Sequence, residues 1–152
     1  MPGYRAHLMG GFTVYIGLLY TLQSLTPTPL TMFEWLGCAL IGSLFPDVDT
    51  KSKGQLWFYR LFFIILIILA LKERYFVAAI ISILGILPML FRHRGLFHRP
   101  LFLVSIPVVA MIIIKICAPA SAQVFFFDAI FFLAGALSHI VMDRGIKALF
   151  RM

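Results

Sequence analysis

Six long apolar runs, separated by short polar segments, fill most of the 152-residue sequence. As α-helices, runs of about 17 residues or more can span the roughly 30 Å of hydrocarbon in a bilayer. The hydrophobic share is 62%, well above the about 45–50% that is usual in soluble domains. The sequence therefore predicts an all-α integral membrane protein, a single transmembrane domain over residues 1–152 built as a bundle of about six helices. The predicted helices cover about residues 7–25, 30–45, 55–71, 75–91, 101–117 and 124–142.

Basic residues are distributed unevenly between the two ends of this predicted bundle. With six helices, both termini lie on one side, together with ten of the thirteen lysines and arginines. The positive-inside rule makes that side cytoplasmic. We therefore expect a multi-pass protein of the cytoplasmic membrane with cytoplasmic N and C termini. Because the basic residues are scattered in short loops rather than gathered on one polar face, nucleic acid is not expected as a partner.

The rarer polar residues collect at the same predicted cytoplasmic end. The topology was assigned from lysine and arginine alone, yet this end also receives all four histidines and three of the four aspartates. They come from four separate parts of the sequence, which predicts that they share a site. The set is His7; Asp47 and Asp49; His93 and His98; His139 and Asp143.

The spacings within this set suit metal binding. His139 and Asp143 are four residues apart, which places imidazole and carboxylate on one face of a helix end. Asp47 and Asp49 follow a proline in a loop, where both carboxylates can turn toward one cation. His93 and His98 are five residues apart, so they can share an ion only if the helix breaks between them, and Gly95 stands between them as a possible break.

Seven candidate ligands exceed the four that one tetrahedral ion requires. Either two ions lie side by side, or a carboxylate is left over as a general base. The mixture of imidazole and carboxylate favours Zn²⁺ or Mn²⁺ over Mg²⁺. The candidate catalytic carboxylates are Asp47, Asp49 and Asp143.

Each feature also has an ordinary explanation. His7 suits an interfacial position, and the aspartate pair suits a solvated loop. The segment with two histidines suits a cationic anchor for anionic lipid headgroups, and His139 with Asp143 suits a hydrogen-bonded helix cap. These explanations give no reason for every histidine to lie at one end, so we favour the metal site.

Three arginines flank the paired histidines, namely Arg92, Arg94 and Arg99. Guanidinium groups bind phosphate well because they donate two parallel hydrogen bonds to it. Their place at the headgroup level predicts contact with membrane lipids and a phosphoester or related ester of a lipid or headgroup as substrate. The same arginines would equally serve only as topology signals or lipid anchors.

The order of these motifs resembles that of a known family. The residues are Ala6-His7, the segment from Gly42 to Asp49, Lys51-Ser52, the segment from His93 to His98, and the segment from Leu137 to Asp143. This pattern resembles the YdjM-type inner-membrane proteins of bacteria. The resemblance implies a metal-dependent hydrolase of the bacterial inner membrane. Where that family often has a histidine after the aspartate pair, this chain has threonine at residue 50, which removes one possible ligand.

Two other functional classes remain open. A transporter of metal ions or protons would place ionisable residues near the bilayer midplane, whereas this set lies at one end. A non-catalytic membrane scaffold would use the ion only to hold its helix ends together. Glu34 and Asp128 lie toward the opposite end, where Asp128 is expected to pair with Lys115.

Overall fold

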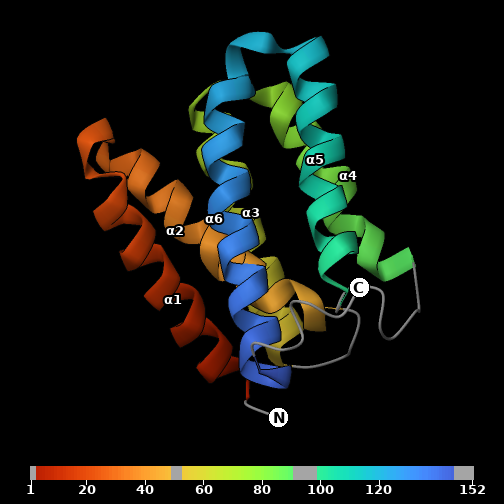
Figure 1. The fold of residues 1–152 in the computed structure, drawn as a ribbon. Coiled ribbons are helices and arrows are strands. Elements are labelled where there is room, and N and C mark those ends of the chain that lie inside the picture. Colours follow the sequence, from red (N-terminus) through yellow and green to blue (C-terminus); the bar gives the residue numbers. More distant parts are fainter. Residues whose placement is uncertain (1–2, 49–52, 91–98, 146–152) are drawn as a thin grey trace.

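The computed structural model describes residues 3–48, 53–90 and 99–145, and in this part of the chain it is helical without strands. The prediction of an all-α membrane bundle is confirmed (Figure 1). The α-helices are α1 (Tyr4–Thr21), α2 (Pro29–Leu44), α3 (Lys53–Leu71), α4 (Tyr75–Leu90), α5 (Pro100–Cys117) and α6 (Pro119–Arg144). Two short 3₁₀ helices, η1 (Gln23–Leu25) and η2 (Phe45–Asp47), follow α1 and α2.

Prolines set the beginnings of three helices. Pro29, Pro100 and Pro119 each stand in the first turn, where a missing N–H group is not needed. Thr28 is the N-cap residue of α2, and its side-chain oxygen accepts a hydrogen bond from the Thr31 N–H at 3.3 Å. The prediction that the last helix begins at about residue 124 is therefore wrong, because Pro119 already begins α6.

Four helices in the described ranges are long and apolar enough to cross a membrane. They are Pro29–Asp47, Lys53–Leu71, Pro100–Cys117 and Pro119–Asp143. The apolar part of α4 is shorter, Tyr75–Ile86. A crossing by α1 or by α4 stays a prediction from the sequence.

The pair of α2 and α6 forms the centre of the bundle. The backbones approach so closely that a Cβ atom added to Gly135 would lie 2.0 Å from the Ala39 carbonyl oxygen. One added to Gly42 would lie 2.0 Å from the carbonyl oxygen of Phe132. Only glycine permits this separation, so these two positions fix how α2 and α6 face each other.

The other helices pack on the two sides of this pair. Figure 1 shows α1 beside α2 on one side, and α4 beside α5 on the other. Where α1 meets the pair, Gly11 lies against Ser43 of α2, and Gly10 against Ser138 and Met142 of α6. Toward the middle, the buried rings of Tyr15, Trp35 and Phe131 fill the space between the three helices.

The alternating directions of the helices place three chain segments at one end of the bundle. There α1 begins, and α2 with η2 and α6 both end (Figure 1). We call this the site end, and the other the opposite end.

Candidate metal centre

His139 and Asp143 occupy the last turns of α6 at the site end. Their spacing of one helical turn puts both side chains on the face that packs against α1 and α2. The His139 Nε2 atom lies 3.4 Å from Asp143 Oδ2. The two side chains are 0% and 3% exposed, so the polar pair lies inside the bundle.

His7 reaches the same place from the first turn of α1. Its ring stacks on that of His139, with the centroids 3.8 Å apart and the planes inclined by 17°. Its Nε2 atom is 3.5 Å from Asp143 Oδ1. Asp143 thus presents one carboxylate oxygen to each histidine.

Asp47 completes the described part of the cluster from η2. Its Oδ1 atom lies 3.6 Å from the His139 Nε2 atom. The backbone here is held by the Gln55 side chain, whose Nε2 atom donates to the Val48 carbonyl at 2.9 Å. In contrast to the other three side chains, that of Asp47 is 41% exposed, so it forms the accessible side of the cluster.

A backbone carbonyl orients the imidazole of His139. Nδ1 lies 2.8 Å from the Ser43 carbonyl oxygen. Because a carbonyl oxygen only accepts, Nδ1 must donate its proton there. The lone pair of the neutral ring is then on Nε2, the atom that faces both carboxylates. Metal-binding histidines are usually oriented by such an outer hydrogen bond.

The separations between these atoms suit an ion held among them. The three N···O distances of 3.4, 3.5 and 3.6 Å exceed the about 2.7–3.2 Å of most hydrogen bonds. Ligand atoms bound to one tetrahedral ion at about 2.0–2.2 Å stand about 3.3–3.6 Å from each other. One ligand atom from each of His7, Asp47 and His139 also lies within 4.8 Å of the other two. These three residues could therefore hold a divalent cation, and Asp143 lies beside them with one carboxylate oxygen near each histidine.

The structure brings together the four predicted ligands that it describes, from α1, η2 and α6. The other predicted site residues Asp49, Arg92, His93, Arg94 and His98 lie outside the described residues. Arg99 is described. It stands at the N-cap of α5 with an exposed side chain, and it forms no ion pair with a described carboxylate.

Sequence reasoning did not identify the carbonyl of Ser43 as the partner of His139. Every residue has a backbone carbonyl that can accept a hydrogen bond, so the identity of residue 43 gave no direct signal for this contact. The adjacent Gly42 offered an indirect one, because small residues in an apolar helix indicate a close helix–helix approach.

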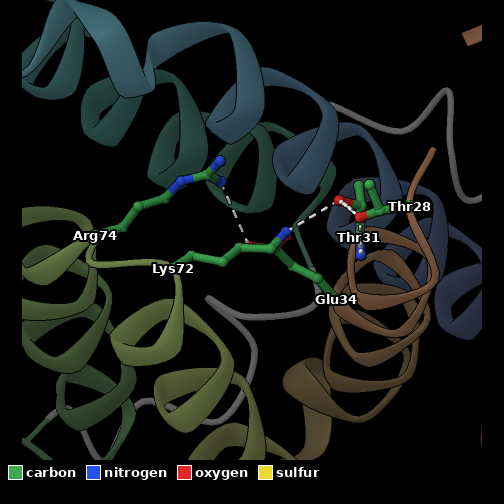
Figure 2. A network of polar contacts seen from close by, with 5 residues as sticks. All are labelled: Thr28, Thr31, Glu34, Lys72 and Arg74. Atoms are coloured by element: carbon green, nitrogen blue, oxygen red, sulfur yellow. Dashed lines mark hydrogen bonds and ion pairs between the residues drawn. The ribbon is translucent and has the colours of Figure 1, made fainter.

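A second buried polar cluster lies at the opposite end and was also missed. Figure 2 shows Lys72 and Arg74, from the turn between α3 and α4, reaching Glu34 on α2. Lys72 contacts Glu34 directly and donates to Thr31 Oγ1 at 3.1 Å, and Arg74 Nη1 is 3.7 Å from Glu34 Oε1. Glu34 is fully buried, so the two cations compensate a charge that would otherwise be costly inside the bundle.

The expected pair of Asp128 and Lys115 is wrong. Asp128 is only 4% exposed, its Oδ1 atom has no hydrogen-bond partner within the described chain, and Lys115 is exposed. The pairing was inferred from their nearness to the turn between α5 and α6, but Asp128 lies on the inner face of α6.

Comparison with protein families matches residues 1–150 to the family described as YdjM inner membrane protein. No curated protein and no solved structure matches the chain. The family match confirms the resemblance found in the sequence, and it spans all three segments that contribute to the described cluster.

Proposed function

Because the chain belongs to the YdjM family of inner membrane proteins, we propose that it is a membrane-bound, metal-dependent hydrolase with its site at the cytoplasmic face. The observation that carries the proposal is the cluster of His7, Asp47, His139 and Asp143. Three N···O separations of 3.4–3.6 Å match the edges of a metal coordination shell better than hydrogen bonds.

The four side chains would have different roles, ion binding or proton transfer, according to their burial. His7, His139 and Asp143 are nearly inaccessible, so they would hold the ion and fix its position. When bound, a Zn²⁺ or Mn²⁺ ion would lower the pKa of a water molecule toward neutrality. Asp47 is the accessible member and stands where a substrate would approach. Asp47, or Asp49 two residues further on, would accept the proton of the attacking water.

The proposed substrate is a phosphoester or related ester on a lipid or its headgroup. Arg92, Arg94 and Arg99 flank the segment that carries the two remaining histidines. Guanidinium groups at the headgroup level would bind the phosphate through paired hydrogen bonds. A substrate held there need not leave the bilayer.

The proposed orientation follows from the basic residues. Ten of the thirteen lysines and arginines belong to the side of the predicted topology that carries the cluster. The positive-inside rule then places the cluster at the cytoplasmic face of a bacterial inner membrane.

Turnover on a defined panel of esters tests this function. Purified protein is incubated with Zn²⁺, Mn²⁺ or Mg²⁺ in turn, together with bacterial phospholipids and lipid phosphates. The same assay is run on a His139→Ala, Asp47→Ala double variant and on Cys117→Ala, an exposed position away from the cluster. We expect turnover that requires an added ion, is lost in the double variant and persists in Cys117→Ala.

Two results would favour one of the alternative functions over a hydrolase. A tightly bound ion with no hydrolysis of any ester would favour a scaffold with a structural metal. Ion flux into sealed vesicles in the absence of hydrolysis would favour a transporter.

A further inference from the structure

Asp128 is a buried carboxyl on α6, a helix long and apolar enough to cross the membrane. It lies 11 residues before His139, or about 16 Å along a helix axis, so it is remote from the proposed metal centre. Its side chain is only 4% exposed. An ionisable residue inside a membrane bundle is costly and usually binds or moves ions or protons. The burial of Asp128 therefore needs a physical reason.

The immediate surroundings of Asp128 do not compensate its burial. Its Oδ1 atom has no hydrogen-bond partner in the described part of the chain. The residue also lines a cavity of about 90 Å³, whose other described lining residues are apolar except for Cys38. A cavity lined in this way does not hold water well. Water is therefore a poor substitute for the missing partner.

The nearest charged groups are already paired with another residue. The Asp128 carboxyl interacts electrostatically with Glu34, Lys72 and Arg74. Both cations, however, form their ion pairs with Glu34 (Figure 2). Among the described residues, Asp128 takes part in no ion pair. An ionised Asp128 would instead be repelled by the charge of Glu34.

The other helices around this part of α6 add no charge. On α2 the titratable neighbour is the thiol of Cys38, which lines the same cavity. The lining residues from α3, α4 and α5 are all apolar. From α1, Tyr15 approaches with its ring 5.8 Å from that of Phe131, about one helical turn beyond Asp128. Within the described chain, the counter-charges near Asp128 are therefore the two cations that Glu34 already holds.

An ionised carboxyl without a partner inside the bundle is so costly that the group takes up a proton instead. We infer that Asp128 is a reversible proton-binding site, which exchanges its proton with the medium through the cluster of Glu34, Lys72 and Arg74. Release breaks the carboxyl O–H bond, leaves its electron pair on Asp128 and passes the proton to a base in the medium. The cluster reaches that medium, because Lys72 and Arg74 are 12% and 23% exposed. This inference does not depend on the proposed hydrolysis.

The charge of Glu34 controls whether the proton stays bound. While Glu34 is ionised, it holds both cations and adds a negative charge near Asp128, and both effects favour the protonated carboxyl. Without that charge, the same two cations would favour an ionised Asp128. Neutralising Glu34 should therefore release the proton from Asp128.

Infrared spectroscopy of protein with a heavy carbon isotope in its aspartate carboxyl groups tests the inference. A protonated carboxyl and a carboxylate absorb in separate bands, and the isotope distinguishes aspartate from glutamate. The samples are the natural sequence, Asp128→Asn and Glu34→Gln, with Glu73→Gln in the exposed turn between α3 and α4 as the control. Size-exclusion elution and helical circular dichroism establish that each variant is folded.

We expect a band of protonated aspartate at neutral pH in the natural sequence and in Glu73→Gln, and its loss in Asp128→Asn and in Glu34→Gln. In the natural sequence the band should disappear at alkaline pH and return on acidification. No such band at neutral pH, or a band undiminished in Asp128→Asn, would overturn the inference. A band that persists in Glu34→Gln would overturn the exchange through the cluster.

Two further variants keep the test decisive. Asp128→Glu retains the carboxyl, so the protonated band should move from aspartate to glutamate even if Asp128→Asn does not fold. An unchanged aspartate band in Asp128→Glu would overturn the inference. Asp143→Asn, at the proposed metal centre, should leave the band unchanged. The band in a protein that hydrolyses no ester would reject only the hydrolase, and hydrolysis without the band would reject only the proton site.

Discussion

At the scale of single residues, we assign two separable functions to the stacked pair of His7 and His139, helix packing and the proposed metal ligation. The parallel rings, 3.8 Å apart, pack α1 against α6, while their nitrogen atoms face Asp143 and Asp47. Packing needs a flat ring, whereas ligation needs a nitrogen atom. A substitution that keeps the ring but removes the nitrogen atoms can tell the two apart.

His7→Phe is that substitution. We expect the variant to stay folded, because phenylalanine keeps a flat ring against His139, and to lose at least about tenfold in metal affinity, as even the loss of an outer-shell partner costs about 10–100-fold. Competition with a graded chelator measures the affinity. Leu8→Phe, at the next position of α1, is the control and should bind as the natural sequence does. Equal affinity in His7→Phe and Leu8→Phe would remove His7 from the ligand set.

At the scale of elements, the proposed metal centre depends on how closely α2 and α6 approach. The proposed ligands come from α1, η2 and α6, and because η2 directly follows α2, the glycine contacts between α2 and α6 set how closely Asp47 approaches His139. A Cβ atom added to Gly135 would meet the backbone of α2, 2.0 Å from the Ala39 carbonyl oxygen. A backbone group cannot rotate away like a side chain, so the helices themselves must separate.

Gly135→Ala should therefore destabilise the protein by about 1–3 kcal/mol, the usual range for overpacking. Gly17→Ala is the matched control, because no atom lies within 4 Å of its added Cβ, and alanine improves helix propensity there by up to about 1 kcal/mol. Thermal unfolding in detergent, followed by circular dichroism, measures both. A Gly135→Ala variant as stable as Gly17→Ala would show that the helices tolerate a wider separation.

The cluster of Glu34, Lys72 and Arg74 joins α2 to the turn between α3 and α4 (Figure 2). Glu34→Gln leaves two cations without their counter-charge. Loss of one partner of a buried pair costs about 3–5 kcal/mol, and we expect the lower end because both cations are partly exposed. Glu73→Gln, in the exposed turn between the two cations, should be neutral. The same unfolding assay compares the two variants, and equal stabilities would contradict a stabilising role for this cluster.

At the scale of the whole molecule, the proposed direction of insertion follows from the basic residues. A reporter fused after residue 152 should report cytoplasm, and one inserted at Glu73 should report the other side, because α3 and α4 turn there at the opposite end. Reporter activity in whole cells measures both. A cytoplasmic signal at Glu73 would contradict the proposed location of the site.

The sequence predicted the helices and part of the site because those features depend on local spacing. Apolar length placed α2 to α5 within a few residues, and the four-residue interval predicted that His139 and Asp143 share a face. The stacking of His7 on His139, the contact with the Ser43 carbonyl and the partners of Glu34 depend on which helix faces are in contact. That choice is made by glycine contacts between distant segments, so it could not be read from spacing alone. Asp128 was mispaired for the same reason.

The central claim is that one end of the bundle holds a divalent ion through His7, Asp47, His139 and Asp143. The most direct test is the metal content of the purified protein, determined by elemental analysis after removal of loosely bound ions. We predict at least one Zn²⁺ or Mn²⁺ per chain in the natural sequence and in Asp128→Asn, a buried carboxyl on the same helix but remote from the cluster. His139→Ala and Asp143→Ala should lose the ion. No bound ion in the natural sequence, or an undiminished content in both ligand variants, would contradict the claim.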